Sequence, residues 1–98
     1  MTPSPPSPAL RRGLRRAIAA LQRGAPQEAE DLLTELITQA PDFADAWHYR
    51  ALAAHQLGRE ADALAGFLRA RELAPERADF AFNEARFHLE RGAPKDAL

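Results

Sequence analysis

Apolar residues recur along this chain with the spacing of a helix. Between Pro26 and Ala40 they fall at i, i+3, i+4, i+7 and i+8, which places them on one helical face. These residues are Ala29, Leu32, Leu33, Leu36 and Ile37. Residues 59–74 repeat the pattern. No run alternates apolar and polar residues, and the chain contains no valine, so we expect no β-strand.

Prolines and glycines mark where these helices begin and end. Pro26 suits a first helical turn, where its missing N–H is not needed, whereas Pro41 and Pro75 end helices because the residue before proline leaves the helical region. Three further helices are expected at residues 9–23, 44–57 and 78–91. Each precedes a glycine that can adopt positive φ and close the helix. These glycines are Gly24, Gly58 and Gly92.

The bends recur with a fixed period. Gly58 stands 34 residues from both Gly24 and Gly92, and the stretch RGAPQEAE at residues 23–30 returns as RGAPKDAL at residues 91–98. Short connections after these glycines fold neighbouring helices into antiparallel hairpins. Small residues keep the same period in two slots, Ala17, Ala51 and Ala85, and Ala29, Ala63 and Ala97. We therefore expect repeat units at about 10–43, 44–77 and 78–98, after a disordered Pro/Ser-rich leader at residues 1–8.

Composition narrows the class of protein. The chain has 98 residues, a net charge of -1 and no cysteine, so we expect one small domain and no strong attraction to nucleic acid. No apolar run could span a membrane. Residues 1–21 hold four clustered arginines and no acid, as a transit peptide does, but the prolines in residues 3–8 would break a targeting helix. We expect a cytoplasmic protein, and the abundance of arginine and alanine is typical of a bacterial gene.

The middle unit resembles the tetratricopeptide repeat family over residues 44–77. The residues that match the spacing of that family are Trp47, Ala51, Leu57, Gly58, Ala63, Phe67, Ala70 and Pro75. The first and third units carry parts of the same pattern, so the resemblance covers about residues 10–98. It implies an all-α, right-handed solenoid of antiparallel helix hairpins, with five helices plus the start of a sixth. It also implies a non-enzymatic module that binds other proteins.

The resemblance further implies a partner-binding groove lined by the first helix of each unit. Its expected lining residues are Leu14, Ile18, His48, Leu52, His55, Phe82 and Arg86. Leu21 and Leu89 occupy further positions of the same kind. The mixture favours a peptide or amphipathic helix as partner, although neighbouring helices could instead cover these residues. Members that hold acidic C-terminal tails use five basic or amide groups, and those positions here are Leu14, Ile18, Tyr49, Asp79 and Asn83, so we expect no tight binding of such tails.

Two positions depart from the family pattern. The slot of Trp47 holds Gly13 and Ala81 in the other units. A second slot is usually apolar in the family, but here it holds Arg16, Arg50 and Glu84. We expect these side chains to extend to solvent. The alternative is an ion pair between Arg50 and Glu84 on successive first helices.

The sequence offers little for catalysis or metal binding. Its two serines lie in the leader, and no histidine stands near Thr34 or Thr38, so the covalent mechanisms lack a nucleophile with a base. His48 and His55 are too far apart for one metal ion, and no third ligand joins the i, i+4 pair of Glu84 and His88. We expect no enzyme activity, no cofactor and no metal.

Two features leave alternatives open. The arginines of the first helix, at residues 11–16, could contact an acidic partner, a membrane surface or nucleic acid, but we interpret them as a solvated face. The chain stops one turn into its sixth helix, which would leave an apolar face of the fifth helix bare. We therefore expect either the N-terminal part of a longer protein, such as the leader of a bacterial sulfotransferase or hydroxylase, or a homo-oligomer formed through that end.

Overall fold

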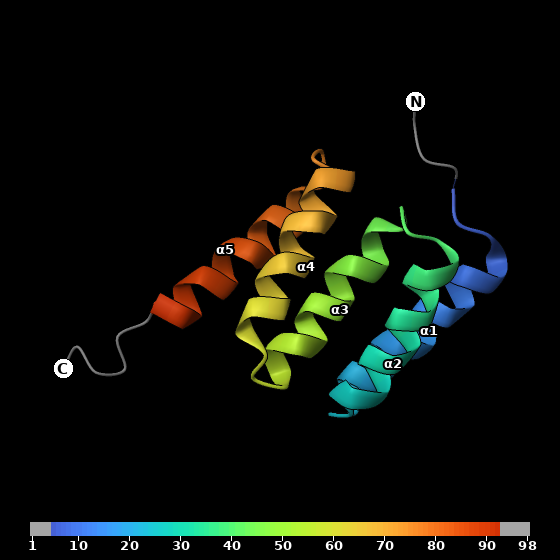
Figure 1. The fold of residues 1–98 in the computed structure, drawn as a ribbon, viewed down its shortest axis with the longest axis horizontal. Helices are drawn as coiled ribbons and strands as arrows, with labels where there is room; N and C mark the ends of the chain where they lie inside the picture. The colour runs from blue at the N-terminus through green and yellow to red at the C-terminus, as the bar shows by residue number, and fades with distance from the viewer. Residues whose placement is uncertain (1–4, 93–98) are drawn as a thin grey trace.

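The computed structural model describes residues 5–92, and within that range every regular element is a helix (Figure 1). The helices are α1 (Pro8–Gln22), α2 (Pro26–Gln39), α3 (Ala44–Gln56), α4 (Glu60–Leu73) and α5 (Ala78–Gly92). The predicted fold class, an all-α solenoid of antiparallel helix hairpins, is confirmed for these five helices. The expected start of a sixth helix lies outside the described residues.

Helix α1 begins one residue earlier than the sequence indicated. The backbone N–H of Leu10 donates to Oγ of Ser7 (3.2 Å), so Ser7 caps the helix. Pro8 is the first helical residue, a position where proline removes no hydrogen bond and where a preceding serine is strongly preferred. The predicted leader, residues 1–8, therefore loses Pro8 to α1, and residues 1–4 lie outside the described range.

The two complete hairpin bends have the same backbone geometry. At the first bend the N–H of Ala25 donates to the carbonyl of Ala20 (2.8 Å), and the equivalent bond 34 residues later is also 2.8 Å. Gly24 and Gly58 adopt φ values of 78° and 79°. This pattern, with glycine in the left-handed region, is the Schellman motif. The third predicted bend glycine, Gly92, is the last residue of α5, and its bend lies outside the described residues.

Small residues bring the helices of a hairpin together. A Cβ built on Gly66 of α4 would lie 2.9 Å from the Cβ of Ala51 and 3.2 Å from the carbonyl oxygen of Trp47 on α3. Ala17 and Ala51 are buried in the equivalent slots of α1 and α3. Ala85, in the same slot of α5, is exposed, because no described helix packs on that side of α5.

The hairpins stack so that each helix packs on the next, and α1 also contacts α3 (Figure 1). Aromatic side chains fill the space between the later helices. The rings of Phe67 on α4 and Phe87 on α5 lie 5.1 Å apart, and both are buried. Stacking therefore joins the odd helices α1, α3 and α5 into one surface on which the predicted groove residues stand.

Candidate functional site

The predicted groove residues differ widely in exposure. Leu14, Ile18, Leu52 and His55 are half-buried on α1 and α3. On α5, Arg86 is exposed and 65 % of the surface of Phe82 is accessible. The seventh residue, His48, is 1 % exposed. The surface that a partner can reach therefore excludes His48 and is widest on α5.

His48 lies between α3 and α5. Its ring stacks on Phe80 with centroids 4.4 Å apart, and the side-chain amide nitrogen of Asn83 lies 3.0 Å from its Nε2, where it donates to the neutral imidazole. Burial lowers the pKa of His48 below its ordinary value, which Asp79 and Asp45 oppose and Arg77 assists. The structure thus places His48 in the core and not in an open groove. Its hydrogen bond with Asn83 connects the stacked helices α3 and α5.

His55, two helical turns after His48 on α3, makes polar contacts with both α4 and α5. Its Nδ1 lies 3.1 Å from a carboxylate oxygen of Glu60 on α4, and its Nε2 lies 3.1 Å from one of Glu90 on α5. Phe87 meets the imidazole edge-on at 5.1 Å. Between residues 5 and 92, no three histidine or acidic side chains converge on a position that could hold a metal ion.

The exposed apolar side chains of the described residues gather mainly on α5. Phe82 is 65 % and Leu89 is 72 % exposed, and Leu68 on α4 is 37 % exposed. Phe82, Arg86 and Leu89 are spaced i, i+4 and i+7, so they share one face of α5. We call this the α5 face. The equivalent positions of α3 hold His48, Leu52 and His55, of which His48 is buried and the other two are half-buried.

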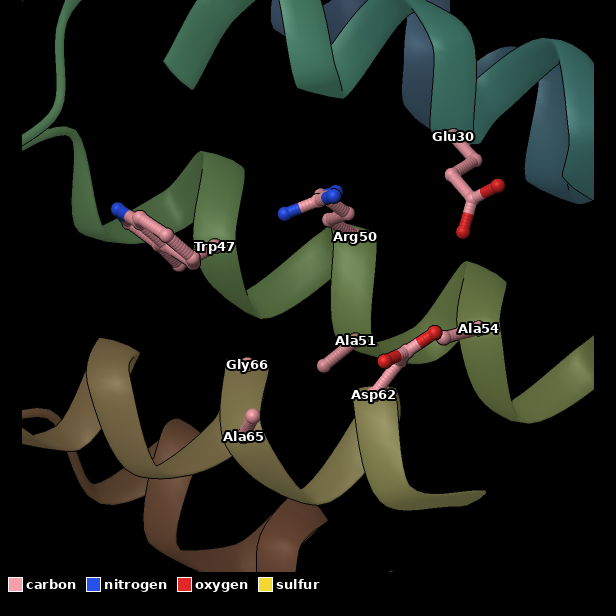
Figure 2. Close-up of a pocket in the computed structure, with 8 residues that line it drawn as sticks. All are labelled: Glu30, Trp47, Arg50, Ala51, Ala54, Asp62, Ala65 and Gly66. Carbon is pink, nitrogen blue, oxygen red and sulfur yellow. The ribbon is translucent and has the colours of Figure 1, made fainter. Parts of the chain in front are cut away.

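A cavity that the sequence did not predict opens between α2 and α4, with α3 as its floor (Figure 2). Its volume is about 140 Å³. Figure 2 shows the charged side chains of Glu30, Arg50 and Asp62 around it, one from each of the three helices. The guanidinium carbon of Arg50 lies 5.9 Å from the centre of the Trp47 ring. The sequence did contain one sign of this cavity: Ala51 and Ala54 of α3 are small side chains close to the charged Arg50.

The structure corrects the expectation for Glu84, which shares a slot with Arg16 and Arg50. We expected it in solvent or paired with Arg50, but it is 5 % exposed. One of its oxygens, Oε2, lies 3.2 Å from Arg71 on α4 and 3.5 Å from His88 on its own helix. Its other oxygen has no partner among the described residues. The reason is the stacking of α5 on α4, which brings Arg71 to Glu84.

Two of the five positions that would hold an acidic C-terminal tail, Asp79 and Asn83, make internal hydrogen bonds. Arg77 donates two hydrogen bonds to Asp79 (2.9 and 2.8 Å) and also lies 3.0 Å from Asp45. This guanidinium lowers the pKa of Asp79, which therefore stays ionised. Asn83 is bonded to His48. Arg77 is a residue that the sequence did not single out, since its role depends on where α3 and α5 meet.

Comparison with known proteins agrees with this architecture. Residues 14–75, more than half of the chain, match the family model described as Tetratricopeptide repeat. A search of curated proteins finds no match to the chain. In the part that the structure describes, no helix combines the length and the apolar character needed to cross a membrane. The repeated hairpins, the equivalent glycine bends and the matching family model agree: the chain belongs to the tetratricopeptide repeat family.

Proposed function

We propose that the chain is a non-enzymatic interaction module that binds a peptide or helix of a partner protein on its odd helices. Repeats of this family typically serve protein interaction, which supports the general role. The observation that carries the site is the α5 face, where Phe82 and Leu89 expose 65 % and 72 % of their surface. Two large exposed apolar side chains on one helical face support an interaction site there, since apolar patches on a protein surface often bind a partner.

The chemistry of the face describes its partner. Phe82 and Leu89 offer apolar contacts two helical turns apart, and Arg86 between them offers an exposed cation. Ile18 and Leu52, half-buried on α1 and α3, add apolar surface on the neighbouring odd helices. An amphipathic helix with apolar residues at i and i+7 and a carboxylate between them would complement this arrangement.

Selection of peptides tests this proposal. Random peptides would be selected on the full chain from a displayed library, and their dissociation constants compared for wild type, Phe82→Ser and Leu68→Ser. Leu68 is the matched control because it is an exposed apolar residue on the even helix α4. We expect Phe82→Ser to weaken binding by about tenfold and Leu68→Ser to leave it unchanged. Peptides that depend on Leu68 and ignore Phe82 would place the site elsewhere.

The α5 face could also bind a second copy of the chain, and this self-association has its own test. If the α5 face pairs with a second copy, sedimentation velocity will show a dimer whose population rises with concentration and falls in Phe82→Ser. The role as N-terminal leader of a larger bacterial enzyme and the cytoplasmic location stay predictions, which the adjoining coding sequence and fractionation of cells would test.

A further inference from the structure

Helix α1 carries four exposed arginines and no acidic residue. Arg11, Arg12, Arg15 and Arg16 occupy one side of its first half. None of the four takes part in an ion pair with another residue of the described range, and Arg11 donates to the carbonyl oxygen of Pro6 (3.3 Å). We call these four residues the α1 arginine face.

Most of the other arginines whose side chains the structure describes form ion pairs, whereas Arg50 and Arg86 do not. The five that pair with acidic residues are Arg23, Arg59, Arg69, Arg71 and Arg77. The chain as a whole has 14 acidic and 13 basic residues, so carboxylates are not scarce. No carboxylate of the described residues forms an ion pair with the four arginines of α1, although Glu35 of α2 lines a pocket together with Arg16.

The repeat shows what these positions do in the other units. The slots of Arg12 and Arg15 are filled 34 residues later by Ala46 and Tyr49, which pack in the core cluster with α1 residues. In α5 the first of these slots holds Phe80, which is buried against His48. The slots that bury apolar side chains between units are therefore cationic in α1. This surface cannot accept another apolar helix in the same way.

The arrangement opposes the stability of α1 itself. Positive side chains near a helix N-terminus meet the positive end of the helix dipole. Arg11 and Arg15, and likewise Arg12 and Arg16, are like charges at i, i+4, which repel. A local conflict without compensation inside the fold is typical of a functional surface. All four residues are arginine, whose planar guanidinium pairs with carboxylates through two parallel bonds.

The surroundings of the face favour a protein partner over a membrane or nucleic acid. The exposed large apolar side chains of residues 5–92 lie on α4 and α5, whereas the large apolar side chains of α1 are at least half-buried, so α1 offers little to insert into a bilayer beside the arginines. No aromatic residue stands on α1 for bases to stack upon.

We propose that the α1 arginine face docks an acidic segment of a partner protein through guanidinium–carboxylate bonds. The surface is separate from the α5 face, so it stands whether or not the function proposed above is correct. It also differs from recognition of a C-terminal carboxylate, because the side-chain carboxylates of the partner supply the charge.

A binding titration tests the proposal. The probe is a fluorescent oligoglutamate peptide with an amidated C-terminus, titrated with the full chain at low and at physiological salt. The test variant is Arg12→Gln/Arg15→Gln. The control is Arg23→Gln/Arg69→Gln, which removes the same charge from exposed, ion-paired positions. We expect the test variant to bind about tenfold more weakly and the control to change by less than about twofold, with affinity falling as salt rises.

Several results would overturn the proposal. The wild-type chain could fail to bind oligoglutamate even at low salt, or both double variants could lose the same affinity, which would indicate net charge alone. Tighter binding to single-stranded DNA of equal charge or to phosphatidylserine vesicles would assign the face to nucleic acid or to a membrane instead. Glutamine keeps the helix propensity of arginine, and circular dichroism of the variants would verify that α1 stays folded.

Discussion

At the scale of single residues, neighbours decide what a side chain does. His48 and Phe82 occupy the same slot of successive units. Helix α5 packs over His48 and buries it, whereas Phe82, on α5 itself, is 65 % exposed. Gly13 stands in the slot of Trp47, and a Cβ there would lie 2.8 Å from the end of the Leu36 side chain. The glycine thus makes room for Leu36, which contributes to the core of the first hairpin.

Burial of His48 makes stability depend on pH. Its folded-state pKa lies below the ordinary value of 6.5, so the unfolded chain binds more protons as the pH falls. The contribution of a neutral His48 is present above about pH 6.5 and is lost as the pH falls toward the folded-state pKa, by up to about 1.4 kcal/mol per pH unit. Urea unfolding of wild type and His48→Phe, compared between about pH 7 and pH 5, checks this.

The difference between the two pH profiles isolates His48, since the other titrating groups are common to both proteins. We expect wild type to lose more stability in acid than His48→Phe. Parallel profiles would contradict the prediction and show that Asp45 and Asp79 offset the effect of burial.

The internal bonds of Asp79 predict a negative result. A carboxylate that Arg77 keeps ionised repels the terminal carboxylate of an acidic tail. We expect an acidic peptide to bind equally well with a free and with an amidated C-terminus. Fluorescence anisotropy with both forms measures this, and a preference for the free carboxylate of tenfold or more, which is about 1.4 kcal/mol, would refute it.

At the scale of elements, the hairpin is the repeated object. Its bend is set by glycine at positive φ, and its width by how closely two helix backbones can approach. Gly66 sits where α4 meets the backbone of α3, whereas Gly13 sits under the flexible end of Leu36. Both glycines lie inside helices, so an added methyl group would change helix propensity equally at the two positions. The positions differ in the neighbouring atoms that this methyl group would meet.

This contrast predicts different effects of the same substitution. Gly66→Ala should lower the free energy of unfolding by about 1–3 kcal/mol, because the rigid backbone of α3 cannot yield to the methyl group. Gly13→Ala should change it by no more than about 1 kcal/mol, because Leu36 can rotate and alanine favours the helix. Thermal unfolding followed by circular dichroism compares the two variants, and equal destabilisation would disprove the close approach of α3 and α4.

At the scale of the whole molecule, stability is shared between neighbouring helices. Phe87 is one of two buried aromatic residues that hold α5, with Phe80, and it packs on Phe67 of α4 and His55 of α3. In a stacked repeat each unit depends on its neighbours and much less on distant units. Loss of the Phe87 contacts should therefore destabilise α5 and leave the distant helices α1 and α2 stable.

Phe87→Ala tests this sharing. We expect it to cost about 3–5 kcal/mol locally and to raise hydrogen exchange throughout α5, while the amides of α1 and α2 keep their protection. Leu89→Ala is the control, because Leu89 is 72 % exposed and its loss should cost less than about 0.5 kcal/mol. A uniform rise in exchange over all five helices would mean that the molecule unfolds as one unit.

The sequence by itself determined the helices, their bends and the period of 34, because these depend on contacts within a few residues of each position. Apolar spacing, proline and glycine are local signals, and they indicated the boundaries of all five helices to within one or two residues. The tertiary structure decided which slots are covered. The burial of His48, the partner of Glu84 and the exposure of Phe82 and Leu89 depend on which helix lies opposite, and the pattern along one helix does not contain that information.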